Sequence, residues 1–368
     1  MTVAPNAVVA RLRAYDPGHD LVGLRATRAP ELLAELGSNE NAWGPSPRVL
    51  EALRSLDPAE VYRYPDPLGG RLKRALAERH GVAPGQIALG NGSHELLMLI
   101  AQCFAQPGDE VVFSQFGFAV FPIGTAATGA TPVVVPAFGR DAAMPRGHDL
   151  AAFAGRLSPR TRIVLASNPN NPTGTWVTRD ALAALLDAVP ADVLVVLDEA
   201  YGEYIDRPEA GSALPLLARH PNLMVTCTFS KAYGLAGLRC GYALAHRDTI
   251  AVLERLRESF NVNAAALLAA EVALTDIGHV DRLLARTAAE RARMTAAIEA
   301  KGWFVHPSMT NFVLVDFDRP AREIEDGLLE AGVVVRPMGG YGLPTCLRVS
   351  VGREEENERF LAALPPRA

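Results

Sequence analysis

The chain has 368 residues, 49% of them hydrophobic and 21% charged, with a formal net charge of -5 at pH 7. A chain of this length usually divides into more than one packed unit, so we expect two. The mild charge and the scattered basic residues exclude nucleic-acid binding from the expected functions.

The cysteines and the N-terminus bear on the expected compartment. Cys103, Cys227, Cys240 and Cys346 lie far apart, without the spacing of a disulfide framework or a zinc site. The first residues lack the basic start and apolar run of a signal peptide, and no uncharged apolar stretch reaches the roughly 18 residues of a membrane helix. We therefore expect a cytoplasmic protein with no metal site and no membrane contact.

The first part of the chain, to about residue 30, is rich in Pro and Gly and has little helical periodicity, which predicts an extended arm. Helical and strand patterns then alternate, with helices expected at 71–80 and 95–104 around a short strand at 87–89. Further strands are predicted at 110–113, 131–135, 161–166, 193–197, 223–228 and 241–245. Several of these are continuous apolar runs, which is typical of a mainly parallel sheet covered by helices on both faces.

After residue 260 the pattern changes. The chain is helical through 300, and then come a strand at 311–316, a helix at 321–331, strands at 333–337 and 346–351, and a closing helix. This order predicts a small α+β unit. We therefore expect an N-terminal arm at 1–34, a large α/β domain at 35–258 and a small domain at 259–368.

Two of the predicted strands end in reactive side chains. The run 193–197 leads into Asp198, and the run 223–228 leads into Ser230 and Lys231. Taken alone, Asp198 fits a helix cap and Lys231 a surface cation. Because ligands of parallel sheets bind at the carboxyl ends of the strands, two such residues at comparable ends favour a shared site.

Two glycine-containing segments predict an anion site. The turn at 90–93 brings Gly92 and Ser93 to the start of a helix. The free N–H groups and the dipole of a helix start attract phosphate. The alternative is an ordinary helix start that Ser93 caps. Arg239 lies between Gly237 and Gly241, where a permissive backbone lets an arginine approach an anion. The loop at 168–174 adds two Asn-Pro units, which exclude a helix and hold an asparagine at another strand end.

With these residues in place, the chain resembles the fold type I pyridoxal 5′-phosphate (PLP)-dependent aminotransferases, which are aspartate aminotransferase-like, and within them the histidinol-phosphate aminotransferase subfamily of the class II enzymes. The resemblance covers nearly the whole chain. Its further motifs are Tyr15-Asp16-Pro17-Gly18, Asn39-Glu40-Asn41-Ala42-Trp43, Tyr64-Pro65-Asp66, Asn171-Pro172-Thr173-Gly174, Asp198-Glu199-Ala200-Tyr201, Phe260-Asn261-Val262-Asn263 and Leu347-Arg348-Val349-Ser350-Val351-Gly352.

The resemblance implies PLP as the cofactor and assigns its ligands. Lys231 would attach PLP as a Schiff base and move the substrate proton, while Asp198 pairs with the pyridine nitrogen. Asn171 and Tyr201 would bind the phenolic oxygen of the cofactor. The phosphate would be held by the group Gly92, Ser93, Ser230 and Arg239, together with Tyr64 of a second subunit.

The remaining site residues concern the substrate and the cofactor ring. Phe118 matches the ring that stacks on PLP, where Tyr is usual, with simple core packing as the alternative. Arg348 would bind a carboxylate, Arg336 and Tyr15 a distal phosphate, and Asn41 is a further substrate residue. A strand-end salt bridge is the alternative for Arg336. His19 and Trp43 depart from the usual pattern of the subfamily, which leaves substrate choice open.

The leading hypothesis is a homodimeric transaminase, with Tyr64 and the arm contributing across the interface. It would interconvert L-histidinol phosphate and imidazole acetol phosphate in histidine biosynthesis, with glutamate and 2-oxoglutarate as the small-molecule amino donor and 2-oxo acid pair. The alternatives are a broad aromatic aminotransferase, a PLP decarboxylase of the O-phosphothreonine type, and a PLP-binding regulator without catalysis. The retained Lys231, Asp198, Asn171 and Arg348 argue against the last.

Overall fold

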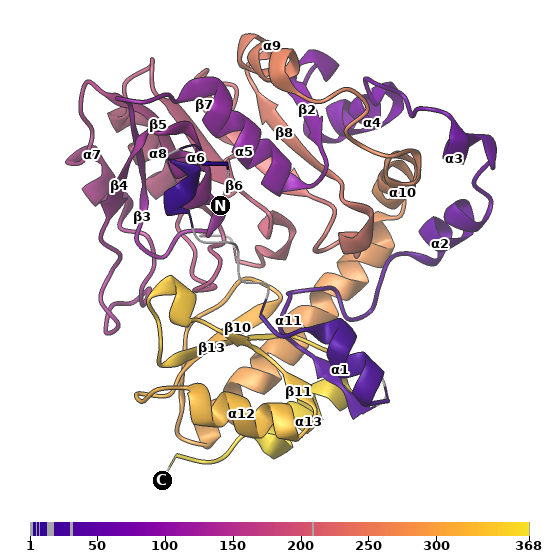
Figure 1. Ribbon diagram of the computed structural model, residues 1–368, viewed down its shortest axis with the longest axis vertical. Helices are drawn as coiled ribbons and strands as arrows, with labels where there is room; N and C mark the ends of the chain where they lie inside the picture. The colour runs from indigo at the N-terminus through magenta and orange to yellow at the C-terminus, as the bar shows by residue number, and fades with distance from the viewer. Residues whose placement is uncertain are drawn as a thin grey trace.

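The computed structural model describes residues 3–4, 6, 8–12, 18–29, 32–207 and 210–367. These residues form a large unit and a small one, the large unit above the small one in Figure 1. Helix α11 (Ile277–Ala300) begins beside the large unit and continues into the small one. The domain boundaries at residues 34 and 258 stay predictions.

The large unit is built on a sheet with the strand order β2-β8-β7-β6-β5-β3-β4. Neighbouring strands from β4 to β7 are parallel, and only β8 runs antiparallel to its two neighbours. The sheet is therefore mainly parallel, as the apolar runs predict. Its strands are β2 (Ile87–Gly90), β3 (Glu110–Ser114), β4 (Thr131–Val135), β5 (Thr161–Ser167), β6 (Leu194–Asp198), β7 (Leu223–Thr228) and β8 (Gly241–Ala245).

Apart from the edge strand β4, which is largely exposed, the strands of this sheet are buried on both faces, which explains their continuous apolar runs. In β6, Leu194 and Val196 pack into the hydrophobic core on one face, whereas Val195 and Leu197 pack into the core on the other. The first core is completed by α5 (Ser93–Phe104), α6 (Val120–Thr128) and α9 (Arg247–Leu256). The second is completed by α4 (Gly70–His80), α7 (Leu150–Ala154), α8 (Arg179–Ala188) and α10 (Ala264–Leu274).

The small unit has an antiparallel sheet with the order β12-β13-β10-β9. Its strands are β9 (Phe304–Val305), β10 (Phe312–Asp316), β12 (Arg336–Pro337) and β13 (Cys346–Ser350). Helices α11, α12 (Arg322–Glu330) and α13 (Glu354–Ala363) contribute to its core. The predicted α+β character of this unit is therefore present.

The single strand predicted at 333–337 is wrong. The chain instead forms β11 (Val333–Val334) and β12, which belong to different sheets: β11 pairs with β1 (Ala34–Glu35), and β12 pairs with β13. The chain changes sheets at Val335, which is buried in the core of the small unit. The apolar run at 333–335 does not reveal this change, because its residues do not indicate which strand each short segment pairs with.

The described residues 18–29 lie on the small unit (Figure 1). Helix α1 (Leu21–Thr27) is followed by Arg28, whose guanidinium donates to the carbonyl oxygen of Leu329 at 2.7 Å. The other helices are α2 (Pro47–Arg54) and α3 (Ala59–Tyr62), and short 3₁₀ turns lie at Val9–Arg11, Pro84–Gln86, Gly202–Tyr204, Leu214–Leu216, Ala236–Leu238 and Gly339–Tyr341.

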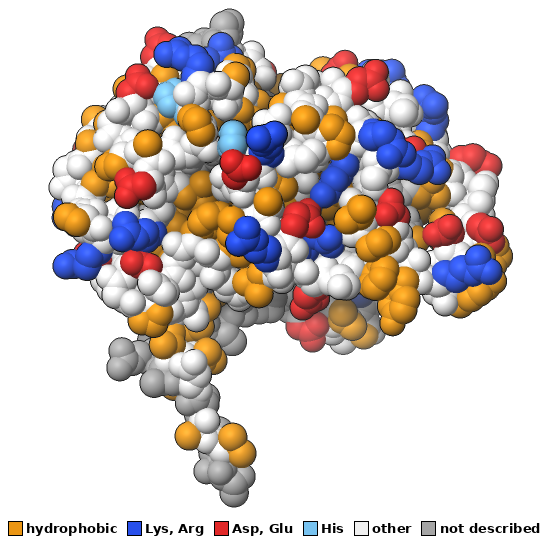
Figure 2. Space-filling view, turned by 90° about the horizontal axis from the view of Figure 1, so that it is seen from above, with side chains coloured by type: hydrophobic (Ala, Val, Ile, Leu, Met, Phe, Trp, Pro, Cys, Tyr) orange, Lys and Arg blue, Asp and Glu red, His pale blue; other side chains and the backbone are white. Residues whose placement is uncertain are grey.

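The surface has no large area of one charge on the face shown in Figure 2, where basic and acidic side chains are interspersed. Within the described part of the chain, no helix is both long and apolar enough to cross a bilayer. No group of three or more His, Cys, Asp or Glu suited to a metal ion occurs among the same residues.

Candidate active site

A cavity of about 210 Å³ lies at the carboxyl ends of β5, β6 and β7, where the large unit meets the small one. This is the edge at which ligands of parallel sheets bind. Most of the residues that the sequence predicts for the site line this one cavity: Ser93, Phe118, Asn171, Asp198, Tyr201, Ser230, Lys231, Arg239, Arg336 and Arg348.

Lys231 follows β7 and points its amine at backbone carbonyls of a distant segment. Its Nζ donates to the carbonyl oxygens of Ser38 at 3.2 Å and Asn39 at 3.0 Å. Burial of the amine, together with the charge of Arg348, lowers the pKa of Lys231 to about 8. A fraction of this amine is therefore neutral near neutral pH and can act as a nucleophile or a base.

Asp198 is the last residue of β6 and is 4% exposed. Its Oδ1 accepts a hydrogen bond from Oγ1 of Thr226 on the neighbouring strand at 2.7 Å. Burial raises the pKa of Asp198 to about 6, although Thr226 and Lys231 oppose the shift. A cation placed against this carboxylate would offset the cost of burying its charge.

The opposite end of the cavity suits an anion. Helix α5 starts at Ser93, and its N-cap Gly92 has φ +86° and provides no side-chain cap, so the first N–H groups of the helix are not capped in that way. The predicted alternative of a cap made by Ser93 is not what the structure has. Nη1 of Arg239 donates to Oγ of Ser230 at 3.3 Å on the same side.

Two glycines allow these groups to come together. A Cβ on Gly92 would lie 2.3 Å from Nη2 of Arg239, and a Cβ on Gly241 would lie 2.6 Å from the backbone nitrogen of Ser93. At Gly241 the neighbour is backbone, so only glycine fits, whereas at Gly92, with its positive φ, a side chain would be strained and would displace the guanidinium group of Arg239. The glycine pattern around Arg239 is thus a packing requirement of this end of the cavity.

Arg348 connects the two units at the cavity. Its Nη1 donates to Oδ1 of Asn171 at 2.7 Å, and its Nη2 donates to the carbonyl oxygen of Gly37 at 2.8 Å. Arg336 lies directly opposite on β12, because the strand register pairs it with Arg348. Two guanidinium groups from adjacent strands therefore face one cavity, which suits a ligand with two anionic groups.

Tyr201 lies between these groups. Its hydroxyl accepts a hydrogen bond from Nδ2 of Asn39 at 2.8 Å. Burial raises the pKa of Tyr201 to about 12, an effect that the charge of Arg348 opposes. The hydroxyl therefore stays protonated at neutral pH and can serve as a hydrogen-bond donor.

The loop at 168–174 is held by its own side chains. Oγ of Ser167 donates to Oδ1 of Asn170 at 2.5 Å, and Nδ2 of Asn170 donates to the carbonyl oxygen of Phe116 at 2.9 Å. Asn170 is fully buried, so the loop presents Asn171 to the cavity. The peptide bonds before Pro169 and Pro172 are both cis.

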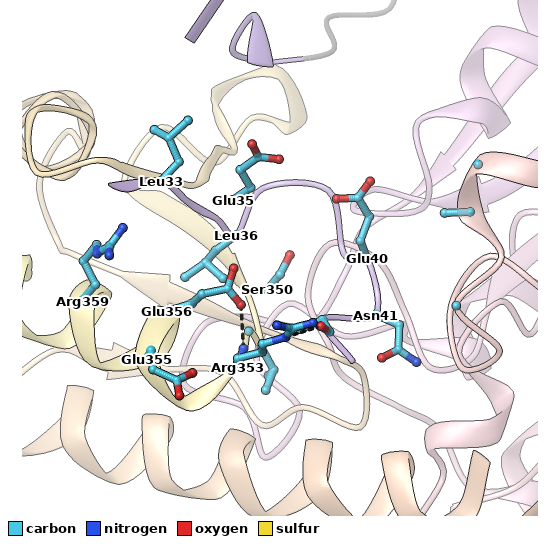
Figure 3. A pocket seen from close by; sticks show the side chains of 16 residues that line it. Leu33, Glu35, Leu36, Glu40, Asn41, Ser350, Arg353, Glu355, Glu356 and Arg359 are labelled. Carbon is cyan, nitrogen blue, oxygen red and sulfur yellow. Dashed lines mark hydrogen bonds between the residues drawn. The ribbon is translucent and has the colours of Figure 1, made fainter. Parts of the chain in front are cut away.

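Four predicted residues lie elsewhere or outside the description. Gly92 is not among the residues that line this cavity, but it contacts Arg239, which does line it. Tyr64 is 81% exposed and stacks on Phe260 with ring centroids 4.5 Å apart. Asn41 donates to the carbonyl oxygen of Ala232 at 3.0 Å and lines a separate, open cavity of about 600 Å³, shown in Figure 3. Tyr15 lies outside the described residues.

Trp43 does not narrow the site cavity. It packs against the hydrophobic core of the small unit and is not among the residues that line the cavity. An aromatic ring that the sequence does not single out, Tyr341, lines the cavity beside Arg336 and Arg348.

His94 and Asn39 are two further site residues that sequence reasoning missed. Asn39 has φ +56°, a conformation that Asn tolerates better than most residues, and this supports its place in a tight turn below Lys231. The run Asn39-Glu40-Asn41 was a signal for it, but no pattern in the sequence connects that run to Tyr201. His94 lines the cavity directly after Ser93.

Comparison with known proteins agrees with this geometry. The family model "Aminotransferase class I and II" matches residues 33–364. Histidinol-phosphate aminotransferase 2 of Pseudomonas aeruginosa is 48% identical over 358 residues, covering 97% of this chain and 95% of that protein. Histidinol-phosphate aminotransferase 2 of Methylococcus capsulatus is 46% identical over 366 residues, covering 99% and 98%.

A solved structure has the same fold. Histidinol-phosphate aminotransferase from Sinorhizobium meliloti, in complex with pyridoxal-5′-phosphate, superimposes with a TM-score of 0.88 at 32% sequence identity, covering 98% of this chain and 96% of that one. The predicted fold class, aspartate aminotransferase-like fold type I, is confirmed. The chain belongs to the aminotransferase class I and II family.

Proposed function

We propose that this chain is a PLP-dependent aminotransferase that interconverts L-histidinol phosphate and imidazole acetol phosphate, with glutamate and 2-oxoglutarate as the other pair. The observation that carries the proposal is the pairing of Arg336 with Arg348 at the cavity that contains Lys231 and Asp198. The relatives described above are named for the same activity. Histidine biosynthesis in the cytoplasm is the proposed setting.

The residues present fit PLP in charge and order. Gly92, Ser93 and Arg239 form an end suited to a phosphate dianion, and Asp198 supplies a buried carboxylate for a protonated ring nitrogen. Lys231 supplies an amine of lowered pKa. The buried carboxylate supports this fit, because burial raises its pKa and a cationic ring nitrogen would offset that effect.

When bound, PLP supplies an electron-accepting ring that stabilises negative charge at the substrate Cα. The amine of Lys231 would take the proton from that Cα and deliver it to C4′ of the cofactor, for which a pKa near the working pH is suited. Asp198 holds its charge against the ring nitrogen. Tyr201 and Asn171 would bind the phenolic oxygen of the ring, and Phe118 would stack on the ring.

Arg348 and Arg336 bind and orient the substrate. The planar guanidinium of Arg348 offers paired N–H groups to a carboxylate, and its contacts with Asn171 and Gly37 hold it in place. Arg336 is assigned to the phosphate of histidinol phosphate. Tyr15 and Asn41 are proposed as further substrate contacts.

We also propose a homodimer in which Tyr64 reaches the cofactor phosphate of the second subunit. Large apolar side chains are exposed around α3: Val61 is 79%, Tyr62 74%, Tyr64 81% and Leu68 62% exposed. Exposed apolar groups clustered in this way are typical of an interface. Light scattering should give the mass of two chains, and a monomeric enzyme with full cofactor affinity would contradict this part of the proposal.

The proposed activity is tested by comparing kcat/KM for histidinol phosphate and for phenylalanine. A clear preference for histidinol phosphate is expected, because only that substrate supplies a phosphate for Arg336. A preference for phenylalanine would instead indicate a broad aromatic aminotransferase. Release of carbon dioxide from O-phosphothreonine, without transamination, would indicate a decarboxylase.

A further inference from the structure

A short N-terminal segment crosses the outer side of Arg336. We call residues 18–21 the strap. Gly18, His19 and Leu21 of the strap line a cavity of only about 20 Å³ together with Arg336. Arg336 also lines the active-site cavity of about 210 Å³. The arginine is therefore bounded by the strap on one side and by the active site on the other.

The strap also has an outer side. Gly18 and His19 line a second cavity of about 400 Å³, whose other walls come from α12 and the glycine turn after β12. The same two residues thus separate an open outer space from the tightly packed space beside Arg336. Removal or displacement of the strap would expose that side of the guanidinium group to this outer space.

Gly18 brings the backbone of the strap into direct contact with the guanidinium group. A Cβ on Gly18 would lie 2.4 Å from Nη1 and 3.3 Å from Cζ of Arg336. The φ angle of Gly18 is +86°, which side-chain-bearing residues rarely adopt. Any larger residue would therefore have to move either the strap or the charged end of Arg336.

His19 ties the strap to helix α12. Its Nε2 lies 2.9 Å from Oε1 of Glu325, a residue that is only 7% exposed. The next residue, Asp20, caps α1 by accepting from the backbone nitrogen of Gly23 at 3.0 Å. His19 thereby holds the strap on the small unit, which is also the unit that carries Arg336 on β12.

We propose that the strap positions Arg336 for the distal anionic group of the substrate, with Gly18 and His19 as positioning residues. The proposal rests on the assignment of Arg336 to a phosphate. A long arginine side chain loses rotamer freedom when it binds an anion, and contacts that already order the side chain reduce this cost. If the strap only covered the small unit, its disturbance would affect all substrates equally.

The test compares L-histidinol phosphate with L-histidinol, which lacks the phosphate, as amino donors for the PLP-loaded enzyme. For Gly18→Ala we expect kcat/KM for histidinol phosphate to fall about tenfold, mainly through KM. The displaced guanidinium group of Arg336 would lose part of its charge-assisted contact with the substrate phosphate. The value for histidinol should stay within about twofold of the wild type. His19→Ala should change the ratio in the same direction by a smaller factor.

Gly108→Ala is the matched control. Gly108 has φ +97°, and a Cβ there would meet nothing within 4 Å. Gly108→Ala imposes the same kind of backbone strain in the turn before β3, far from the strap in sequence. It should leave the ratio of kcat/KM for histidinol phosphate to kcat/KM for histidinol unchanged. Equal losses for both donors in Gly18→Ala and His19→Ala, or no loss in either variant, would overturn the proposal.

A second readout separates this proposal from the proposed function. If the wild-type enzyme does not use histidinol phosphate, the function is wrong, but the strap is still tested by inorganic phosphate. Calorimetric titration of the PLP-loaded enzyme should show weaker phosphate binding in Gly18→Ala than in Gly108→Ala. Equal phosphate affinity in the two variants would refute the role of the strap.

Discussion

Replacement of Asp198 by Asn should have opposite effects on the enzyme with and without PLP. The substitution keeps the shape of the side chain and an oxygen that accepts from Thr226. It removes the negative charge of a residue that is only 4% exposed. Burial raises the pKa of this carboxyl from 3.8 to about 6. A pKa difference of this size corresponds to about 3 kcal/mol of unfolding free energy.

The direction follows from linkage. Because the folded-state pKa of Asp198 lies above the unfolded value, the ionised side chain destabilises the fold. The cost is absent below pH 3.8, grows as the pH rises and is complete above about pH 6. Without PLP, Asp198→Asn should therefore be more stable than the wild type by up to about 3 kcal/mol at pH 8, and by about half as much at pH 5. Urea unfolding of the cofactor-free proteins at the two pH values measures this difference.

With PLP the sign should reverse. Loss of the carboxylate leaves the ring nitrogen without its charged partner, so PLP affinity should fall by about 10²-fold, equivalent to about 3 kcal/mol, and kcat should fall by at least as much. Equilibrium dialysis and steady-state kinetics measure the two effects. A cofactor-free variant less stable than the wild type at pH 8 would refute the reasoning about burial, and unchanged PLP affinity would refute the role of Asp198.

Glu199→Gln is the matched control for this experiment. Burial also raises the pKa of Glu199, to about 7. Its carboxylate accepts from Oγ of Ser212 and the backbone nitrogen of Ala213, and it does not line the cavity. Glu199→Gln should leave PLP affinity unchanged. A lower PLP affinity in this variant would mean that a buried charge in this region affects cofactor binding without contacting the cofactor.

Three further variants test the remaining assignments. Lys231→Ala should abolish transamination and the visible absorbance of covalently attached cofactor, and an active variant would contradict its role. Gly92→Ala places a Cβ 2.3 Å from Nη2 of Arg239 and should raise the Kd for PLP about tenfold. Gly81 also has a positive φ, +65°, but a Cβ there meets open space, so Gly81→Ala should leave this Kd unchanged. Arg348→Lys loses the planar group that contacts Asn171 and Gly37, so KM for glutamate should rise about 100-fold, and an unchanged KM would exclude Arg348 as the carboxylate ligand.

The large sheet was predictable because its strands, apart from the exposed edge strand β4, are buried on both faces. Alternate residues of β6 enter opposite cores, so a continuous apolar run is required there and is easily recognised. The strands at 131–135, 223–228 and 241–245 have the predicted bounds. The short strands were not predictable to the same degree, since β11 and β12 have two residues each and their separation depends on pairing with different, distant strands.

The candidate site shows the same division. Residues that follow buried strands, such as Asp198 and Lys231, were predictable because parallel strands deliver their ends to one edge of a sheet. Asn39, His94 and Tyr341 were not, because their places depend on segments that are distant in sequence. The place of Trp43 was not predictable for the same reason, since the ring packs against the core of the small unit.

Sequence alone was sufficient for the α/β architecture, the strand-end lysine and carboxylate, and the glycine turn beside Arg239, because each is a local consequence of burial or backbone geometry. Only the tertiary structure decided what surrounds them. The carbonyls of Ser38 and Asn39 below Lys231, the pairing of Arg336 with Arg348, and the contact of Gly18 with Arg336 all join segments far apart in the chain. Contacts of this kind arise from the tertiary packing of distant segments, within the small unit as well as between the two units, which no periodicity in the sequence encodes.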